Sequence, residues 1–580
     1  MKKILSLLLL TLIFALAFTS CTALKGAFVK CEVKFDLDGG VADEGFIESV
    51  TVKYGKTISM PTPTRDNYTF MGWYADGELY TSTTAITKDV VLKAEWSFNE
   101  TYKITYNTNG KGENIPADFV KLGTLPQIPT APQVEGYVFA GWYLDEALTE
   151  RYYFDYALDA DTTLHANFYD TQLGEYIVIS TFEQLAAIKD DPAAKYLLAC
   201  DINCHGEAIT PINEFTGELH GNGYKIYDFT ISDTALTSGF IRTNKGTIKD
   251  LTFKDFVIDV LVNAAADKNY GAICGINEGV IENCDVVDGD LRVNDSLISQ
   301  QAVGYSHIGG IIGNNSGIIS NCSSLVNITV KTYSCASSAG FNINKATHHY
   351  IFVGGVTGTN NDGGTVNCCV SKGNIETESE TVSEHTEYRY METIIYVGGI
   401  SGRNYGEINS SINTGNMKID FIDPSAAEAL YIYVGNAVGL NNGKIRGCYT
   451  TGNIEVFGAA TTSWIGGFVG ENYLQSGYSA MINKCFSIGS IIVDNVPTNY
   501  GYFVGATNGT EKHCYYLDTV TINQKTVVDD VETLVALEPT TKVGEAKTIE
   551  ELLSVDFILN TLNFDRMEWF IVDGKLPELR

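Results

Sequence analysis

The chain has 580 residues, of which 44% are hydrophobic and 19% charged, and its formal net charge is −31. A chain of this length exceeds a single hydrophobic core and is expected to contain several domains. The negative charge repels phosphate backbones, so nucleic acid is excluded as a partner. We interpret the charge as keeping an exported protein soluble. Calcium binding is the alternative, although no acidic loop has the ligand spacing of a calcium site.

The first residues have the features of an export signal. Two lysines precede an apolar run from Ile4 to Phe18, and small residues and then Cys21 follow. This pattern predicts a secretory signal peptide over residues 1–20, too short for a secure membrane span. The small residues and Cys21 resemble the bacterial lipoprotein box. The resemblance implies that Cys21 receives lipid and holds the mature protein to the membrane; ordinary cleavage nearby, with Cys21 an incidental thiol, is the alternative.

Two similar segments follow, which we assign to residues 21–98 and 99–170. In each, apolar and polar residues alternate between Gly and Pro turns, which predicts short strands with one buried face. The shared Gly-Trp-Tyr core resembles the Listeria–Bacteroides repeat of internalin B-type surface proteins. The resemblance implies small β-grasp-like domains that serve as a spacer or an adhesive arm. We expect Trp73 and Trp142 to be core residues, with ligand stacking as the alternative.

We assign residues 171–520 to a repeat domain with an N-terminal cap. Over roughly Phe215–Asp518 it repeats one unit, which is clearest at Ile308–Ile328 and returns at intervals of roughly 30 to 50 residues. The Gly-rich strand ends of this unit resemble the GLUG motif of bacterial surface proteins, which is named for a Gly-Leu-x-Gly core. Each unit offers strands too short to bury a face alone, so the rungs must stack. We expect a right-handed parallel β-helix. A propeller is the alternative, but its blades carry four strands and these units show about three.

Both ends of a solenoid need a cover. An amphipathic helical turn with Thr181 as its N-cap is expected at the first rung. Residues 521–580, with a capping box of Thr548 and Glu551, are expected to form a C-terminal cap. The predicted fold class is therefore mostly β, with two small β-grasp-like repeat domains, a right-handed parallel β-helix and short helical caps.

The chain contains 13 cysteines, which in an exported protein ordinarily indicate disulfides. Their placement argues otherwise, because one column of the repeat accepts Leu, Cys or Ser, at Leu251, Cys284, Cys322, Cys369, Ser411, Cys448, Cys485 and Cys514. Such a column requires a small-to-medium buried side chain, so we expect free buried thiols. Neighbouring rungs lie near disulfide distance, which keeps some pairing open. Cys368 is expected to replace the Asn of the turn.

A column of ring-bearing residues stands two positions before the first Gly of successive repeats, at His307, Phe352, Tyr396, Tyr433 and Trp464. An Ile or Val always follows, so strand alternation places the rings on the face opposite the core. Two interpretations stay open. The rings stack between rungs beneath loops, or they form a strip that binds carbohydrate or peptide. Long insertions at one point of the unit, expected to be loops, would lie beside this column.

No catalytic signature occurs, because His-Glu-x-x-His, Gly-x-Ser-x-Gly and phosphate-binding loops are all absent from the sequence. We interpret the adjacent His348 and His349 as a solvated pair rather than metal ligands. Four aspartates of the early rungs are expected to serve turns, although a carboxylate cluster of a β-helix enzyme is the alternative, at Asp201, Asp228, Asp250 and Asp255. We predict no metal, no cofactor and no catalytic residue.

Three functions are consistent with these patterns. The favoured one is a lipid-anchored bacterial surface protein whose β-helix binds a glycan, or a protein of a host or neighbouring cell. The second is a purely structural surface stalk. The third is a β-helix carbohydrate-active enzyme, which would require a groove with paired carboxylates.

Overall fold

A computed structural model describes residues 29–42, 46–65, 68–98, 101–154, 156–299, 303–336, 347–383, 391–422, 428–528 and 531–579. Cys21 and the export signal lie outside these residues. The chain divides into two compact units, residues 1–132 with 142–167 and residues 133–141 with 168–580. No helix in the described part of the chain is both long and apolar enough to cross a membrane.

The first repeat is a five-stranded sheet in the order β2-β1-β5-β3-β4. Its strands are β1 (Lys30–Asp36), β2 (Ser49–Lys53), β3 (Tyr68–Ala75), β4 (Glu78–Tyr80) and β5 (Val90–Phe98). β1 and β5 pair in parallel at the centre, and the outer pairs are antiparallel, as in a β-grasp sheet. Trp73 is 1% exposed, and its indole Nε1 donates to the Pro61 carbonyl at 2.8 Å. The prediction that Trp73 is a core residue is confirmed.

The second repeat has the same strand order, β7-β6-β10-β8-β9. Its strands are β6 (Thr101–Asn107), β7 (Asp118–Lys121), β8 (Tyr137–Tyr143), β9 (Arg151–Tyr152) and β10 (Thr162–Asp170), and the short helix η1 (Thr171–Leu173) follows. Trp142 is 2% exposed and packs against Tyr106 with ring centroids 5.0 Å apart. Trp142 is therefore a core residue as well.

The solenoid begins with the helix α2 (Phe182–Ala186), which continues as η2 (Ala187–Asp190). Thr181 caps α2 and forms a capping box with Gln184, as its position in the sequence predicts. Leu185 and Ile188 lie buried in the solenoid core, so the helix covers the first rung.

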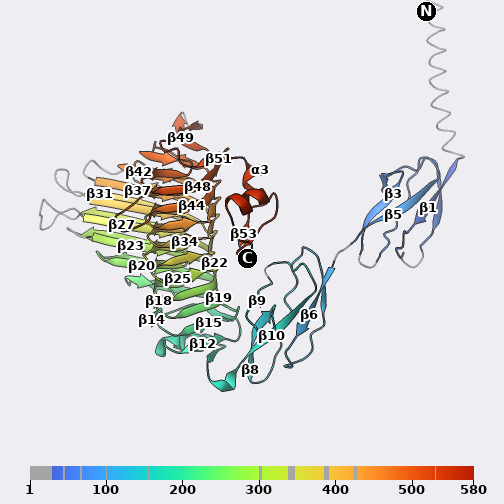
Figure 1. Ribbon diagram of the computed structural model, residues 1–580, viewed down its shortest axis with the longest axis horizontal. Coiled ribbons are helices and arrows are strands. Elements are labelled where there is room, and N and C mark those ends of the chain that lie inside the picture. Colours follow the sequence, from blue (N-terminus) through green and yellow to red (C-terminus); the bar gives the residue numbers. More distant parts are fainter. Residues whose placement is uncertain are drawn as a thin grey trace, which may run out of the picture. The chain divides into compact units, whose positions relative to one another are not determined.

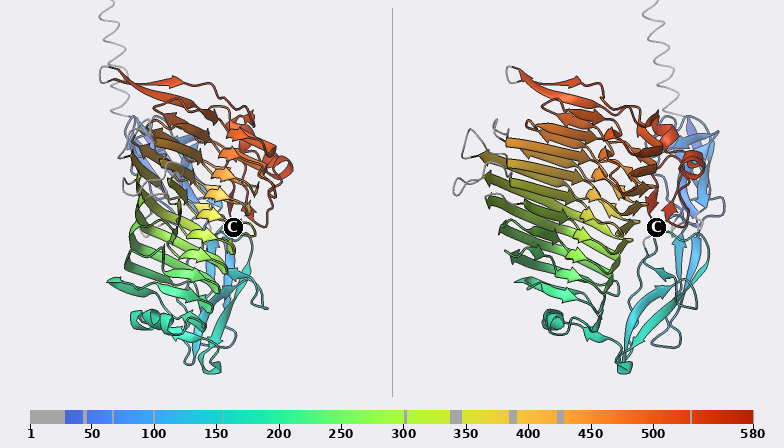
Figure 2. Two further views of the ribbon diagram at one scale, coloured as in Figure 1. Left: turned by 90° about the vertical axis from the view of Figure 1, so that its left-hand side faces the viewer. Right: turned by 60° about the vertical axis from the view of Figure 1, so that its left-hand side comes forward.

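Three sheets form the walls of the solenoid, and Figures 1 and 2 show their strands stacked rung upon rung. The nine-stranded sheet contains β14 (Ile212–Phe215), β18 (Ile241–Asn244), β21 (Cys274–Asn277), β24 (Ile312–Asn315), β28 (Thr357–Asn360), β33 (Ser401–Asn404), β38 (Val438–Asn441), β43 (Val469–Asn472) and β47 (Val504–Thr507). The eight-stranded sheet contains β17 (Thr237–Ser238), β20 (Asp267–Gly271), β23 (Val303–Gly309), β27 (Thr347–Gly354), β32 (Met391–Gly398), β37 (Glu428–Gly435), β42 (Thr462–Gly466) and β46 (Asn499–Gly501).

The third and longest sheet has 24 strands. They are β11 (Ile177–Ile179), β12 (Lys195–Leu198), β13 (Ile202–Ala208), β15 (Glu218–His220), β16 (Lys225–Asp233), β19 (Thr247–Asn263), β22 (Val280–Ser299), β25 (Ile318–Ser320), β26 (Ser323–Ala336), β29 (Thr365–Asn367), β30 (Val370–Ser371), β31 (Ile375–Ser383), β34 (Glu407–Asn409), β35 (Ile412–Asn413), β36 (Met417–Phe421), β39 (Lys444–Arg446), β40 (Tyr449–Thr450), β41 (Ile454–Phe457), β44 (Met481–Ser487), β45 (Ile491–Val493), β48 (Thr510–Leu517), β49 (Ile522–Val528), β50 (Val531–Ala536) and β51 (Glu545–Lys547). Neighbouring rungs pair in parallel, for example β23 with β27 and β24 with β28. The predicted parallel β-helix is confirmed.

One corner of each rung lies within the long sheet, immediately before the cysteine column. Residues at this corner adopt a left-handed backbone, with φ between 45° and 65°, at Asp250, Asn283, Asn321, Cys368, Ser410, Gly447, Lys484 and His513. Asn, Asp and Gly tolerate this conformation best. Cys368, with φ 50°, does occupy the place that Asn holds in other rungs. Asp250 therefore serves the turn, and Asp228 and Asp255 also have positive φ.

The cysteine column points inward and consists of free thiols, as predicted. Each Sγ donates to the carbonyl two residues earlier, as from Cys322 to Ser320 at 3.1 Å and from Cys369 to Asn367 at 3.2 Å. Ser411 donates to Asn409 in the same way at 2.7 Å. A small side chain with one donor satisfies this position, which explains why Ser411 can replace Cys there.

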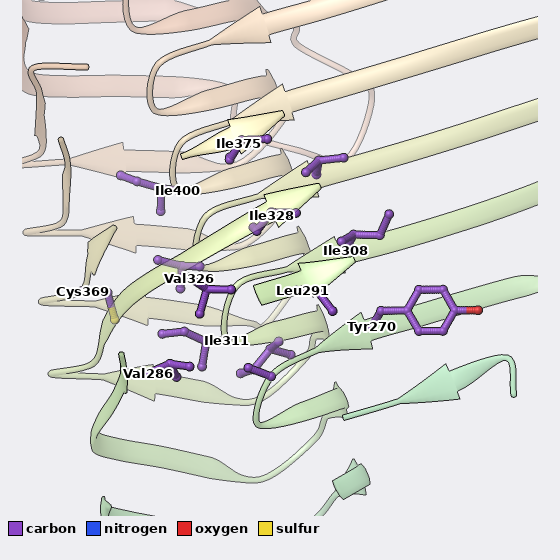
Figure 3. Close-up of a cluster of buried hydrophobic side chains, with 14 of the residues drawn as sticks. Tyr270, Val286, Leu291, Ile308, Ile311, Val326, Ile328, Cys369, Ile375 and Ile400 are labelled. Carbon is purple, nitrogen blue, oxygen red and sulfur yellow. The ribbon is translucent and has the colours of Figure 1, made fainter. Parts of the chain in front are cut away.

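Apolar side chains from all three sheets fill the solenoid. Figure 3 shows part of this core, with Val286, Ile308 and Ile328 from strands and Ile311 and Ile400 from the turns between strands. An asparagine ladder runs beside this core at the end of the nine-stranded sheet. Each amide donates to the next rung at 2.7–2.9 Å along Asn244, Asn277, Asn315, Asn360, Asn404, Asn441 and Asn472. Because the amides are buried and paired, the ladder fixes the register of the rungs.

The long insertions of the repeat were expected to be loops, and that expectation is wrong for most of their length. They extend the long sheet and the eight-stranded sheet into two facing layers, which we name the wing. The wing comprises residues 257–263, 267–270, 290–299, 303–308, 328–336, 347–353, 375–383 and 391–397. Polar residues enter its inward positions, with Asp295 after Val293 in β22 and Thr332 after Val330 in β26. Leu297 of β22, also buried, stays apolar. The inserted residues can be strands because their backbones pair with the neighbouring rungs.

The end of the chain first continues the stack and then packs beside it. β49 pairs in parallel with β45 and forms an antiparallel hairpin with β50. The helix α3 (Ile549–Leu552) has the predicted Thr548–Glu551 capping box, and the π-helix η3 (Phe557–Thr561), β52 (Trp569–Phe570) and β53 (Glu578–Leu579) follow. Trp569 and Phe557 join a second core with Tyr449, Phe486 and Tyr515 of the long sheet.

Candidate functional site: an aromatic face on the solenoid

The predicted ring column lies on the outer surface of the eight-stranded sheet, and we name it the aromatic ladder. Its rings stack in sequence, with centroids 4.8 Å apart for His307 and Phe352, and 4.9 Å for Phe352 and Tyr396. The distances are 4.6 Å for Tyr396 and Tyr433, and 4.3 Å for Tyr433 and Trp464. Interplanar angles stay between 3° and 18°. In-register parallel rungs impose this stacking, because they repeat roughly every 4.8 Å.

Burial along the ladder is uneven. Phe352 and Tyr396 are 2% and 6% exposed, whereas His307, Tyr433 and Trp464 are half-buried. Each inner ring has both faces covered by its neighbours, so the middle of the ladder is cross-rung packing. The Ile and Val residues that follow lie on the opposite face in the core, as predicted, at Ile308, Val353, Val397, Val434 and Ile465. Only the ladder's two ends and its ring edges are open to a ligand.

A second row of rings flanks the ladder, two residues earlier on the same strands, and the sequence analysis missed it. Tyr305, Tyr350 and Tyr431 are half-buried, and they pack against the ladder together with Ile394. Tyr305 and Tyr350 stack at 4.9 Å with an interplanar angle of 13°. Strand alternation could have revealed these residues, because side chains two positions apart share a face. We name this row and the ladder together the aromatic face.

Arg403 adds a positive charge to the aromatic face from the neighbouring nine-stranded sheet. Its guanidinium carbon lies 4.3 Å from the ring centroid of Tyr405, 5.8 Å from that of Tyr396 and 5.9 Å from that of Phe352. These distances are within the range of cation–π attraction. In strand register, Arg403 stands between Thr359 and Leu440.

His307, at the lower end of the ladder, is neutral at physiological pH. Its Nδ1 lies 2.7 Å from Oγ1 of Thr359. Burial, with the nearby Arg403 charge, lowers the pKa of His307 to about 3. The charge that a ligand meets on this face therefore comes from Arg403.

Glu471 stands one rung above Leu440 on the same outward column of the nine-stranded sheet. Burial raises the pKa of its carboxyl from 4.5 to about 7. The negative charge of Glu471 also contributes to raising the pKa of the Tyr396 and Tyr433 phenols. The aromatic face thus gains a negative charge as the pH rises through neutrality.

Replacement of Glu471 by Gln is expected to stabilise the protein at high pH only. The folded state holds this proton more tightly than the unfolded state, so the carboxyl costs stability as pH rises from 4.5 to 7. We expect no change at pH 4 and a gain of about 1 to 2 kcal/mol in the free energy of unfolding at pH 8, after allowance for partial exposure. Urea unfolding at both pH values measures this. Glu407→Gln, which breaks an exposed pair with Lys444, is the control and should give no gain in stability. Equal effects of Glu471→Gln at both pH values would contradict the raised pKa of Glu471.

The wing contains a buried ionic network that the sequence analysis did not foresee. Lys268 Nζ donates to Asp295 Oδ1 at 2.5 Å, and His349 Nε2 lies 2.9 Å from Asp295 Oδ2. Ser306 donates to the same carboxylate, and Ser334 Oγ lies 2.8 Å from His349 Nδ1. Burial alone would raise the pKa of Asp295, but His349 and Lys268 outweigh it and hold the pKa at about 2. This network satisfies the polar interior of the wing.

The interpretation of His348 and His349 as a solvated pair is wrong. Strand alternation sends His349 into the wing, where it is 0% exposed, and leaves His348 outside, 2.7 Å from a Glu392 carboxylate oxygen. Ser334, His349 and Asp295 resemble a hydrolase triad in their contacts, but the side chains are buried between two sheets and a substrate cannot reach them. Among the described residues, no group of three or more His, Cys, Asp or Glu side chains is arranged to hold a metal ion.

Comparison with known proteins concerns mainly the two repeats. Residues 32–95 and 102–167 match the family described as the Listeria-Bacteroides repeat domain, which confirms the predicted pair of copies. A protein of Evansella cellulosilytica, provisionally named a membrane protein, is 33% identical over 141 residues, which are 23% of this chain and 20% of that protein. Internalin H of Listeria monocytogenes is 33% identical over 144 residues, 23% of this chain and 24% of its own length. The chain thus matches about a fifth to a quarter of these relatives.

Two solved structures are similar over more of the chain. One, provisionally named an immunoglobulin A1 protease from Bacteroides ovatus, has a TM-score of 0.31 and 14% identity, and the match covers 70% of this chain and 91% of that one. The other, named IgA1 Protease, has a TM-score of 0.31 and 12% identity, with 83% of this chain and 33% of that one covered.

Proposed function

We propose that the chain is a non-enzymatic bacterial cell-surface protein, anchored by lipid on Cys21, whose solenoid of GLUG-type repeats binds a glycan or a protein of another cell. The observation that carries the proposal is the aromatic face with Arg403 set against its rings. Tyr, Trp and Arg are the residue types that dominate binding energy at recognition surfaces. On this rigid scaffold they are held in place before a ligand arrives, which lowers the entropic cost of binding.

A purely structural stalk is the second candidate. The stacked, buried rings of Phe352 and Tyr396 favour it, because they stabilise the solenoid whether or not a ligand exists. The half-buried Tyr431, Tyr433 and Trp464 at the upper end favour binding, since a stalk alone does not require aromatic side chains that stay partly open to solvent.

Loss of the open rings is expected to abolish ligand binding without unfolding the solenoid. We would compare residues 22–580 with a Tyr431→Ala/Trp464→Ala variant, which keeps the buried Phe352 and Tyr396, on a broad glycan array and on bacterial and mammalian cells. We expect at least a tenfold loss of binding, because each aromatic anchor contributes about 1 to 2 kcal/mol. Tyr473→Ala, which removes an exposed ring elsewhere, is the control. Equal binding by all three proteins would argue against this face, and no binding by the parent would favour the stalk.

Replacement of Cys21 by Ala is expected to release the protein from the membrane. The proposed lipid on Cys21 holds the protein to the membrane, and a covalent acyl chain contributes about 0.8 kcal/mol for each buried methylene. Cell fractionation and labelling with a clickable fatty acid would measure the change in the native bacterium. Cys31→Ala, a buried thiol of the first repeat, should retain label and membrane association. Retention of the label by Cys21→Ala would contradict the lipid assignment.

A further inference from the structure

We propose that Arg403 and the rings around it form a binding site for the acidic group, a carboxylate or a sulfate, of a glycan. This inference rests on the proposed adhesive function and names the ligand class that the aromatic face takes. It does not follow from the aromatic rings alone, which recognise neutral and acidic sugars alike.

Arg403 has no carboxylate partner among the residues that the structure describes, although the chain has 70 acidic and only 39 basic residues. Its polar contact is a long one, from Nε to Asn442 Oδ1 at 3.5 Å. Glu471 stands two rungs away on the same column, roughly 10 Å along the stack. A guanidinium prefers a planar acidic partner that accepts two hydrogen bonds. In the proposed site, the ligand supplies that acidic group.

The rings hold the guanidinium in position. Tyr405 lies directly against it at 4.3 Å, and Phe352 and Tyr396 border it at just under 6 Å. Contacts of this kind restrict the long side chain, so less conformational entropy is lost when a ligand binds. They also leave the two terminal amino groups of Arg403 without a partner among the described residues.

A polar depression that Tyr405 also lines favours a sugar over an acidic peptide. It has a volume of about 270 Å³, and Tyr405 and Tyr478, whose ring centroids are 4.8 Å apart, form its aromatic wall. Asp362, Glu407 and Lys444 supply charged groups to it. Thr365, Ser479 and several glycines complete the lining. Few apolar groups line it, so it suits the hydroxyl groups of one sugar residue better than an apolar side chain. Tyr405 thus joins an anion-binding group to a sugar-sized site.

The test measures binding of the purified, detergent-solubilised full chain to five soluble probes by calorimetry. Polygalacturonate and hyaluronan carry carboxylates, chondroitin sulfate adds sulfates, dextran is neutral, and polyglutamate is the acidic peptide. We expect binding to one or more acidic glycans, with weak or no binding to dextran and polyglutamate. Arg403→Gln should lower that affinity at least tenfold, because a charge-assisted pair is lost. Arg403→Lys keeps the charge but not the planar fork, and should give an intermediate loss.

Arg446→Gln is the matched control, because it removes an exposed arginine of the same solenoid outside the aromatic face and should bind as the parent does. Thermal unfolding of each variant shows whether the fold is intact. Undiminished binding by folded Arg403→Gln, alongside loss in Tyr431→Ala/Trp464→Ala, would overturn the inference and leave the adhesive function standing. Preference for dextran or polyglutamate would overturn the acidic glycan as ligand. Absence of binding to every glycan would overturn the inference, and the cell-binding assay would then decide the adhesive function separately.

Discussion

Replacement of Asp295 by Ala is expected to destabilise the wing by about 3 to 5 kcal/mol. The substitution leaves the Lys268 ammonium, which is 0% exposed, without a countercharge between two sheets. It also removes the acceptor of His349 and Ser306. An unpaired buried charge is costlier than the absence of the whole pair, so the loss should exceed that from any exposed ion pair.

Hydrogen exchange measured by mass spectrometry locates this effect, because solenoids open locally rather than as one cooperative unit. We expect faster exchange in β22, β23, β26 and β27 of Asp295→Ala and little change in the two N-terminal repeats. Asp290→Ala, in the same strand, is the control and removes a carboxylate that is 40% exposed. It should change the free energy of local opening, derived from the exchange rates, by less than about 1 kcal/mol. Matching effects of the two variants would contradict the role given to the buried network.

Acid should affect the wing through the same carboxylate. The pKa of Asp295 is lower in the folded state than its ordinary value of 3.8, so its stabilising contribution is complete above pH 4 and is lost as pH falls through 2. Asp295→Ala has no such group and should lack that part of the acid dependence. Exchange rates of the wing at pH 5 and pH 3 measure the difference.

The sequence was sufficient for the parts of the fold that depend on local chemistry and repetition. The place of Cys368 in the left-handed corner could be inferred because Asn283 and Asn321 hold that place in the two preceding rungs. The aromatic ladder could be assigned to the outer surface because Ile or Val always follows each ring. The cysteine column could be assigned as buried thiols because Ser411 replaces Cys in one rung. In each case neighbouring rungs repeat one environment, so several residues report on one position.

The sequence was insufficient where the environment changes along a strand or between sheets. His349 looked solvated because the wing appeared to be a loop, and its partners Lys268 and Asp295 lie 81 and 54 residues earlier. Arg403 occurs in one rung only, and its contact with the ladder depends on how two sheets meet at a corner. Because no other rung has an equivalent residue, the repeat pattern does not predict the contacts of Arg403. Its partners depend on tertiary structure and not on spacing in the sequence.

Close contact between rungs makes a single methyl group intolerable at one glycine column of the solenoid. A Cβ added to Gly452 would lie 1.9 Å from the carbonyl oxygen of Gly415 in the rung below, which is far inside van der Waals contact. The next rung repeats the arrangement, with Gly489 set against Gly452. Because backbone atoms form both sides of the contact, no side chain can rotate away to make room.

We therefore expect Gly452→Ala to cost about 3 kcal/mol, the upper range for overpacking, and to separate rungs on both sides of the substitution. Hydrogen exchange should accelerate in β35, β40 and β41, whereas the wing should be unaffected. Gly304→Ala is the matched control, since its added Cβ would meet Leu297 at an ordinary 3.4 Å and should change stability by less than about 0.5 kcal/mol. A Gly452→Ala protein as stable as the control would mean that the rungs can separate without cost. The small residue in this column would then reflect turn preference alone, whereas the predicted loss would show that direct backbone contact between rungs sets the spacing on which the aromatic face depends.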